Sequence, residues 1–176
     1  MIYTCTYPSP LGNILLAADD VGLTGLWFER QKYFGNTLPK ETISQETPVL
    51  IQAKKWLDVY FSGVEPKFTP ALHPTGSTFR QAVWQILLQI SYGQTITYGE
   101  IARQMSEIQN TPHMSAQAVG GAVGHNEISI IIPCHRVVGS NGSLTGYAGG
   151  IDRKIALLKL EHTDMSHLFA PKKAQK

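Results

Sequence analysis

Residues 128–138 read Ile-Ser-Ile-Ile-Ile-Pro-Cys-His-Arg-Val-Val, and this stretch decides how the second half of the chain is interpreted. The run of β-branched apolar residues predicts a short buried strand. Pro133 should end it, because proline cannot donate to a strand ladder and keeps the preceding residue extended. In a regular strand, Cys134 and His135 would face opposite sides. The break at Pro133 therefore allows the thiol and the imidazole to face one site.

The Cys134–His135 pair is a candidate nucleophile and base. A free thiol has a pKa of about 8.5, so a histidine that takes its proton at neutral pH activates the sulfur. A third group must then orient the imidazole, and from the residues alone Glu127, Asp152 and Glu161 are all candidates. The plain alternative is a buried structural cysteine beside a surface histidine, since buried cysteines are common.

The composition predicts a globular protein of one medium domain or two small ones. Of its 176 residues, 43% are hydrophobic and 16% charged, and the formal net charge of +2 permits a nucleic-acid partner without requiring one. Cys5 and Cys134 are too few for a disulfide scaffold or a four-cysteine zinc site. The chain starts without a signal-peptide pattern and has no apolar run of membrane-spanning length. We therefore expect a soluble cytoplasmic protein without a metal site.

The first half is predicted to be rich in strands. Residues 2–7, 12–18 and 23–28 have strand composition and are separated by turn residues. An amphipathic helix capped by Thr47 should follow them. A proline-rich stretch then predicts a linker, with a domain boundary near residue 75.

The second half is predicted to be mainly helical. Apolar spacing and cap residues place helix starts after Ser77, Thr97 and Ser115, and a last helix at residues 151–160. The helices after Thr97 and Ser115 suggest a helix-turn-helix. The helix after Ser115 has almost no bulky side chain. On composition alone, two explanations for this are equally good. One is the close approach of a large ligand such as a DNA backbone, and the other is tight packing against another helix.

These motifs make the second half resemble a known family. The helix-turn-helix, the Ile-Pro-Cys-His-Arg-Val motif and the Gly-Tyr-Ala-Gly-Gly sequence at 146–150 are similar to those of the methylated-DNA–protein-cysteine methyltransferases. The resemblance runs from about residue 79 to residue 161 and is looser in the first half. It implies an α+β protein. A small N-terminal RNase-H-like β-sheet domain would span 1–75, a C-terminal helix-turn-helix (winged-helix-like) alkyltransferase domain 76–165, and a flexible tail 166–176.

The resemblance also implies an activity. Members of this family remove alkyl groups from the O6 position of guanine and transfer them irreversibly to their own cysteine. We therefore expect a monomeric repair protein that flips O6-alkylguanine out of double-stranded DNA and acts once per molecule. O4-alkylthymine is a further candidate substrate. No cofactor is expected, because the damaged DNA is itself the alkyl donor. Flipping is needed because the alkylated oxygen lies inside the base stack.

Individual residues receive roles from the same resemblance. Cys134 would accept the alkyl group, His135 would deprotonate it through a bound water, and Glu161 would orient the histidine. Asn126 would hold a helix and the active-site turn together by hydrogen bonds. Tyr98 would help rotate the nucleotide and give a proton to the departing base. The guanine pocket would be lined by Tyr147, Ala148 and Lys154.

The expected DNA contacts lie mainly on the second helix of the motif. In the family this helix enters the minor groove, and a side chain, usually arginine, pushes into the base stack. Gln117 occupies that position here, and glutamine can intrude and hydrogen-bond but carries no fixed charge. The departure concerns the efficiency of flipping and not the chemistry. The other expected contacts are Gly99, Ala116, Ala118, Gly121, Arg136 and Ser140.

Three other functions compete with this interpretation. A cysteine hydrolase would use Cys134, His135 and Glu161 as a triad and would turn over repeatedly. A helix-turn-helix regulator would contain an inert buried cysteine, but the family's regulatory members carry an extra cysteine-rich domain that is not found in this sequence. A non-catalytic lesion binder of this fold would lack the acceptor cysteine, so Cys134 argues against it.

Overall fold

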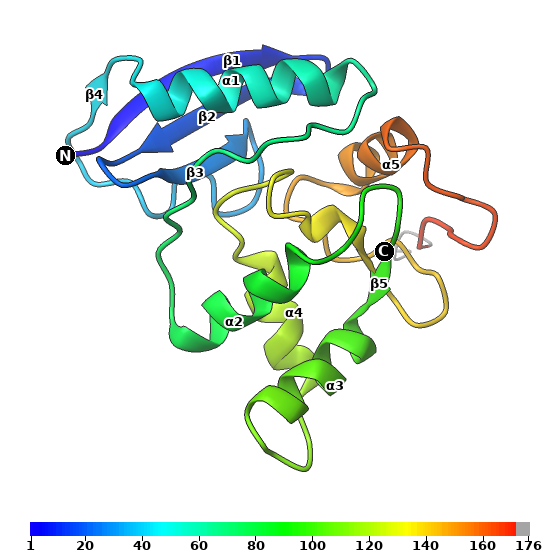
Figure 1. Ribbon diagram of the computed structural model, residues 1–176. Coiled ribbons are helices and arrows are strands. Elements are labelled where there is room, and N and C mark those ends of the chain that lie inside the picture. Colours follow the sequence, from blue (N-terminus) through cyan, green and yellow to red (C-terminus); the bar gives the residue numbers. More distant parts are fainter. Residues whose placement is uncertain (172–176) are drawn as a thin grey trace, which may run out of the picture.

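The N-terminal part of the protein is a four-stranded sheet. The computed structural model describes residues 1–171, and in Figure 1 the sheet lies above the helices α2, α3 and α4 of the second half. The strand order is β3-β2-β1-β4, with β2 antiparallel to β1 and β3, and β4 parallel to β1. The strands are β1 (Tyr3–Ser9), β2 (Gly12–Ala18), β3 (Leu23–Phe28) and β4 (Ile43–Ser44). The three predicted strands are confirmed with a small shift in β1, and β4 was not predicted.

Helix α1 (Pro48–Phe61) packs against this sheet, as Figure 1 shows. The predicted cap is confirmed, because the Thr47 hydroxyl accepts a hydrogen bond from Leu50 N. Pro48 is the first helical residue, where its missing N–H would have had no intrahelical partner. The buried stripe of the helix consists of Leu50, Ala53, Trp56, Leu57 and Tyr60.

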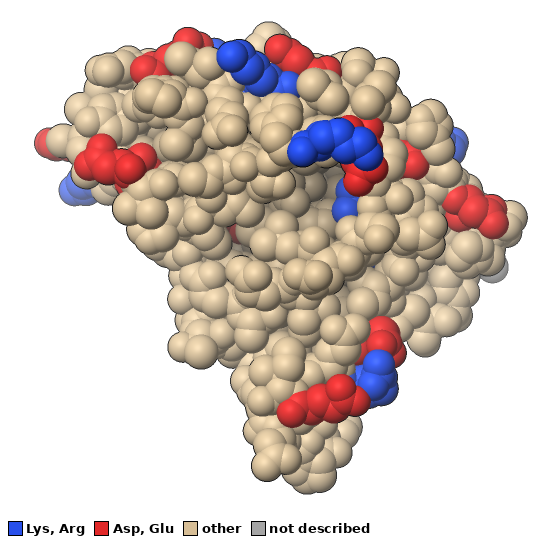
Figure 2. Space-filling model, in the orientation of Figure 1, with Lys and Arg blue, Asp and Glu red and all other residues tan. Residues whose placement is uncertain are grey.

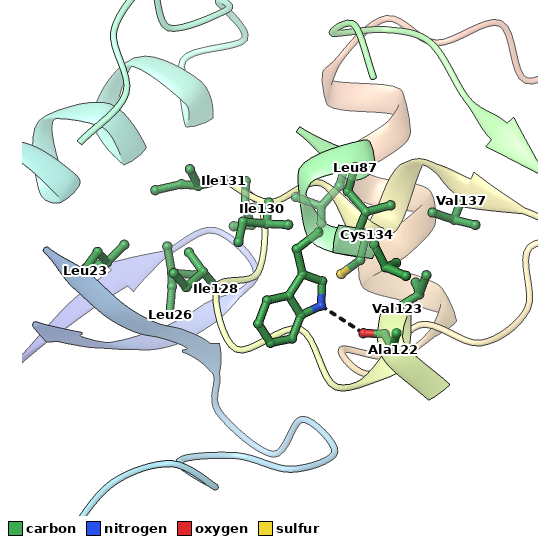
Figure 3. Close-up of a cluster of buried hydrophobic side chains, with 14 of the residues drawn as sticks. Leu23, Leu26, Leu87, Ala122, Val123, Ile128, Ile130, Ile131, Cys134 and Val137 are labelled. Atoms are coloured by element: carbon green, nitrogen blue, oxygen red, sulfur yellow. Dashed lines mark hydrogen bonds between the residues drawn. The ribbon is translucent and has the colours of Figure 1, made fainter. Parts of the chain in front are cut away.

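Three helices of the second half share an apolar core. They are α2 (Thr78–Leu87), α3 (Tyr98–Ile108) and α4 (Ala116–Gly124). Each begins after a predicted cap whose hydroxyl accepts a backbone N–H: Ser77, Thr97 and Ser115. Helix α4 packs against both α2 and α3, and the Trp84 indole N–H donates to Ala122 O at 2.9 Å, drawn as a dashed line in Figure 3. Within residues 1–171, no helix is long and apolar enough to cross a membrane.

The strand predicted at residues 128–132 is wrong, although the segment is buried as expected. Only Ile128 pairs, in a single bridge with Leu26 of β3. Leu26 N donates to Glu127 O at 2.8 Å, and Ser129 N donates to Leu26 O at 2.9 Å. Figure 3 shows Ile128 beside Leu26, with Ile130 and Ile131 further along the same segment, and all three belong to the apolar core. The apolar run therefore reflects burial between two layers and not membership of a sheet.

Beyond this bridge the chain turns sharply. Ile130 is buried and has φ +70°, a left-handed conformation that β-branched residues rarely adopt. After Pro133, a single 3₁₀ turn (Cys134–Arg136) leads into β6 (Val137–Val138), which pairs in parallel with β5 (Ile96–Thr97). The turn predicted at Pro133 is confirmed.

The proline-rich stretch predicted as a linker is docked on the sheet. Leu23 N donates to Ala71 O at 2.7 Å, and His73 N donates to Leu23 O at 2.7 Å. The stretch therefore covers the outer side of β3 next to the Leu26–Ile128 bridge. The domain boundary near residue 75 stays a prediction.

Helix α5 (Ile151–Leu160) has the predicted bounds and packs against the 3₁₀ turn. The first part of the tail at 166–176 forms backbone hydrogen bonds, and the flexibility of the tail stays a prediction. Leu144 N donates to Phe169 O at 2.9 Å, and Phe169 N donates to Gly142 O at 3.1 Å. Residues 172–176 lie outside the described residues.

Truncation of Ile128 to alanine should destabilise the whole protein. The side chain is fully buried between β3 and the helical half, and removing such a side chain typically costs about 2–5 kcal/mol. The free energy of unfolding, measured by urea titration, checks this. As a control, Ile51→Ala on α1 removes a side chain that is 41% exposed and should change stability by less than about 0.5 kcal/mol. Equal losses in the two variants would contradict the packing described for Ile128.

Candidate active site

A single 3₁₀ turn carries Cys134 and His135 into the interior. Cys134 N donates to Ile132 O at 2.8 Å and Arg136 N donates to Pro133 O at 3.0 Å. These two backbone hydrogen bonds fix the turn on either side of Cys134 and His135. The Cys134 side chain is 5% exposed and His135 is fully buried. A surface histidine, the plain alternative from the sequence, is therefore excluded.

The carboxylate of Glu161, at the C-terminal end of α5, holds the His135 ring. His135 Nε2 lies 2.6 Å from Glu161 Oε2, and both side chains are fully buried. A carboxylate only accepts hydrogen bonds, so Nε2 carries the proton and Nδ1 is the acceptor of the neutral ring. Burial lowers the pKa of His135 below its usual value, against the opposing effect of Glu161. Because Nδ1 has no hydrogen-bond partner among the described residues, it is available to accept a proton.

The geometry also decides between the three candidate acids. Glu127 is buried, but its Oε2 accepts a hydrogen bond from Trp27 Nε1 at 2.8 Å. Asp152 is exposed in the first turn of α5. Of the three, only Glu161 is hydrogen-bonded to His135 in the described part of the chain.

Three further donors converge on Glu161, and the sequence analysis did not find them. Tyr60 Oη donates to Oε2 at 2.6 Å, Arg136 Nε donates to Oε1 at 2.8 Å, and Gly93 N lies 3.4 Å from Oε1. Burial alone would raise the pKa of Glu161, but His135 and Arg136 hold this pKa well below its usual value. The carboxylate is therefore ionised at neutral pH. No local sequence signal could link Tyr60 to Glu161, which lie 101 residues apart.

Asn126 connects the end of α4 to the active-site turn. Its Nδ2 donates to Ile132 O at 2.8 Å and to the Cys134 sulfur at 3.2 Å, and its Oδ1 accepts from Ile128 N at 3.0 Å. Burial raises the pKa of the Cys134 thiol, while the Asn126 amide and the Lys154 ammonium oppose this shift. The amide is thus placed to stabilise a thiolate at this position.

Lys154 and Tyr98 donate hydrogen bonds to the same backbone carbonyl, that of Thr145. Lys154 is fully buried and donates to Val137 O at 2.5 Å and Thr145 O at 2.9 Å, and burial lowers its pKa to about 8. Its ammonium group is thus held by backbone carbonyls in the interior, and its place in the guanine pocket stays a prediction. Tyr98 Oη donates to Thr145 O at 3.2 Å, and burial raises the pKa of Tyr98 to about 12. Its hydroxyl keeps its proton at neutral pH.

A cavity of about 320 Å³ lies between α4 and residues 146–148. Its lining consists of Gly120, Gly121, Gly124, His125, Gly146, Tyr147, Ala148, Lys32 and Tyr33. Tyr147 and Ala148 of the predicted guanine pocket are therefore brought together, although Cys134 is not part of the lining. The Tyr147 ring lies 6.4 Å from that of His135, and burial, followed by the charge of a Cys134 thiolate, raises the pKa of Tyr147 well above its usual value.

One wall of this cavity comes from the N-terminal half, which the sequence analysis missed. The Tyr33 ring stacks on His125 with centroids 4.0 Å apart, and Lys32 N donates to Ala148 O at 3.0 Å. Residues around Tyr33 have the composition of an ordinary loop, so no pattern in the sequence indicated this contact.

The small residues of α4 leave open space on one side of the helix. A Cβ added at Gly120, Gly121 or Gly124 would meet no other atom of the described residues within 4 Å. Packing within the protein therefore does not require these glycines, which favours the close approach of a ligand over tight helix packing. The expected DNA-contact residues Ala116, Gln117, Ala118 and Gly121 are exposed on α4, as are Gly99 and Ser140 elsewhere.

Arg136 was predicted among the DNA contacts, but its guanidinium is bound inside the protein. The side chain is buried, with Nε bound to Glu161 and Nη1 donating to Ile90 O at 2.7 Å. Its guanidinium carbon lies 5.8 Å from the centre of the Tyr92 ring. The guanidinium therefore balances the charge of Glu161 and is not available to a phosphate.

Family models match both halves of the chain. Residues 2–74 match the 6-O-methylguanine DNA methyltransferase, ribonuclease-like domain, and residues 78–163 match the 6-O-methylguanine DNA methyltransferase, DNA binding domain. The chain belongs to this family. The predicted α+β fold, a ribonuclease-like sheet followed by a helical DNA-binding part, is thereby confirmed.

Individual relatives span nearly the full chain. The methylated-DNA–protein-cysteine methyltransferase of Haemophilus influenzae is 44% identical and covers 91% of this chain and 86% of its own length. The protein of the same name from Mycobacterium tuberculosis is 45% identical, with coverages of 92% and 93%. The crystal structure of Mycobacterium tuberculosis OGT in complex with DNA matches with a TM-score of 0.78 at 42% identity, covering 94% of each chain.

Replacement of Glu161 by glutamine should destabilise the protein and reduce its sensitivity to acid. The variant leaves the Arg136 guanidinium buried without its counter-charge, and breaking a buried pair typically costs about 3–5 kcal/mol. The folded-state pKa of Glu161 lies below the ordinary value of 4.5. The ionised Glu161 therefore contributes its full stabilisation of the folded protein above pH 4.5, and this contribution is lost as the pH falls below that value. Urea titrations at neutral pH and through the acid range measure both effects.

The control for this prediction is Glu107→Gln, which removes an exposed acid paired with Arg103 on α3. An exposed pair typically contributes less than about 1 kcal/mol, so stability and acid sensitivity should stay close to those of the unmodified protein. If Glu161→Gln and the unmodified protein lost stability in parallel below pH 4.5, the assigned shift in the Glu161 pKa would be wrong.

Proposed function

We propose that this protein repairs double-stranded DNA by transferring an alkyl group from the O6 position of guanine to Cys134. The observation that carries the proposal is the buried arrangement in which Glu161 fixes the His135 ring while Asn126 donates to the Cys134 sulfur. Membership of the family supports it, since the relatives from Haemophilus influenzae and Mycobacterium tuberculosis are named for transfer of a methyl group from DNA to a protein cysteine.

The transfer is a displacement at the alkyl carbon. His135 Nδ1 accepts the thiol proton of Cys134, directly or through one water, and Glu161 stabilises the imidazolium that forms. The thiolate electron pair makes the S–C bond while the C–O6 bond breaks, and the electrons of that bond go to the guanine. Tyr98, which keeps its hydroxyl proton at neutral pH, gives a proton to the departing base and regains one from solvent, while His135 releases the thiol proton to solvent, so that in sum the thiol proton is replaced by the alkyl group and the base gains a proton. The product is a thioether, which is a poor leaving group, so each molecule acts once and without a cofactor.

The alkylated nucleotide must leave the base stack before the sulfur can reach it. The exposed face of α4 has no bulky side chain near its glycines, which allows this helix to enter the minor groove, with Gln117 filling the gap in the stack. The cavity of about 320 Å³ is near the lower end of the range for small-molecule sites, about 300–1,000 Å³, and suits one base.

The proposed DNA-binding surface carries little charge. Helix α4 contains no Lys, Arg, Asp or Glu, and Arg103 on α3 is paired with Glu100 and Glu107. Figure 2 shows Lys and Arg side chains as separate small patches on the face in view, without a continuous basic surface. The affinity for DNA would therefore come more from close contact of α4 with the DNA and from hydrogen bonds than from a cluster of Lys and Arg side chains.

We also propose that the protein acts as a cytoplasmic monomer, with an N-terminal domain at 1–75 and a DNA-binding and alkyl-acceptor domain at 76–165. The site takes Tyr60, His135 and Glu161 from one chain, so it is complete without a second copy. The reaction requires Cys134 as a free thiol, which a reducing compartment maintains.

A duplex that contains one O6-methylguanine tests the proposed reaction. We expect the peptide that carries Cys134 to gain one methyl group, and each protein molecule to react no more than once. Peptide mass measurement checks both points, with the Cys5 peptide as an internal control. Cys134→Ala should gain nothing. Repeated turnover, or methylation elsewhere in the chain, would favour a hydrolase or an unspecific reaction and contradict the proposal.

Substitution of Gln117 by arginine should speed repair of duplex DNA. The guanidinium adds a charge-assisted hydrogen bond, typically about 1.5 kcal/mol, which corresponds to about a tenfold rise in the single-turnover rate. The rate with free O6-methylguanine base should stay the same, because no nucleotide has to be flipped. Gln109→Arg at the exposed end of α3 is the control for the added charge alone. An equal gain in both variants, or on both substrates, would argue against a flipping role for Gln117.

A further inference from the structure

Tyr60 reaches the active-site acid from the opposite half of the protein. It lies on α1, which packs on the N-terminal sheet, and its side chain is fully buried. Its hydroxyl donates to Glu161 Oε2 at 2.6 Å, and His135 Nε2 lies 2.6 Å from the same oxygen. Tyr60 and His135 therefore share one acceptor atom, and any change in one of these hydrogen bonds acts on the other.

The position of the Tyr60 hydroxyl is set by aromatic packing. Its ring stacks on Trp56 of the same helix, with centroids 5.1 Å apart and an interplanar angle of 11°. It also meets Phe61 edge to face at 5.4 Å and Tyr92 at 6.4 Å. Burial raises the pKa of Tyr60 well above its usual value, so the hydroxyl stays protonated and acts as a donor. The hydrogen bond to Glu161 is thus directed by the packing of α1.

We infer that Tyr60 is a positioning residue through which the N-terminal half sets the proton affinity of the His135–Glu161 pair, and with it the pH range in which Cys134 reacts. This inference rests on the proposed function. A donor on Oε2 takes up part of the carboxylate charge, so less remains to stabilise an imidazolium at His135. The Tyr60 hydroxyl therefore keeps His135 neutral to lower pH, and a neutral ring is the form that can accept the thiol proton.

The other charged and titratable groups around the pair do not depend on the Tyr60 hydroxyl. On Oε1, Glu161 is bound by Arg136 from the 3₁₀ turn and by the backbone N–H of Gly93. The remaining groups facing the pair are Lys154 of α5, Cys134 of the 3₁₀ turn, Tyr147 with its ring 6.4 Å from that of His135, and Tyr92 beside Arg136. Tyr60→Phe removes one hydroxyl and leaves all of these in place.

The experiment measures the single-turnover rate of methyl transfer from duplex DNA to Cys134 as a function of pH, in the full-length protein and in Tyr60→Phe. Without the hydroxyl, His135 should bind its proton more tightly, so the acid limb of the rate profile should move to higher pH. A shift of about half a pH unit or more is expected, which lowers the rate on the acid side about threefold. At higher pH, where the rate no longer depends on pH, the rate of the variant should differ much less from that of the unmodified protein.

Tyr7→Phe is the matched control. Tyr7 is also in the N-terminal half, and its hydroxyl donates to Asp58 at 2.6 Å in an exposed pair remote in sequence from Glu161. The acid limb of this variant should coincide with that of the unmodified protein. If Tyr60→Phe lowered the free energy of unfolding but left the limb in place, Tyr60 would be a structural residue only and the inference would be wrong.

A second substitution gives the opposite sign and avoids loss of packing. Site-specific 3-fluorotyrosine at position 60 makes the hydroxyl more acidic and a stronger donor, so the acid limb should move to lower pH. A limb that does not move, or that moves in the same direction as in Tyr60→Phe, overturns the inference. Failure of the unmodified protein to methylate Cys134 would instead refute the proposed function, so the two failures are distinguishable.

Discussion

A buried, ionised carboxylate is the constraint on which the rest of this structure depends. A charge inside a protein is strongly unfavourable unless it is paired and hydrogen-bonded. Glu161 meets this condition through donors from three separate parts of the chain: Tyr60 on α1, Gly93 ahead of β5, and His135 with Arg136 in the 3₁₀ turn. Displacement of any of these parts would remove a hydrogen bond from the buried charge, so the acid joins the sheet half and the helical half into one unit.

The same environment keeps the thiol protonated in the resting protein. Burial raises the pKa of Cys134, so the resting sulfur keeps its proton even though the Asn126 amide and the Lys154 ammonium favour the thiolate. The neutral His135 ring supplies a base that is held in one tautomer by Glu161. Reactivity is therefore governed by hydrogen bonds around a hidden sulfur and not by exposure of the sulfur to solvent.

Local signals predicted the helices of this fold well, and contacts between distant segments escaped prediction. Ser77 and Thr97 cap their helices as expected because a cap is a bond to a residue three positions away. The isoleucine-rich run before Pro133 was assigned to a strand because its apolar composition indicates burial. Burial alone does not distinguish a strand from a turn that lies between two layers. Cys134 and His135 were candidates because they follow Pro133, whereas Glu161 was selected from three acids by the family resemblance. Tyr60 lay beyond any motif, since its role depends on how the two halves meet.

The stretch leading to Cys134 also covers the edge of the N-terminal sheet. β3 is an outermost strand, and unpaired N–H and C=O groups along such a strand can recruit a strand from another molecule. Residues 71–73 and 127–129 occupy those groups, while the opposite border, β4, is only two residues long. Detachment of residues 127–129 would therefore uncover a surface prone to aggregation. A molecule damaged at that point would lose its chemistry and its solubility together.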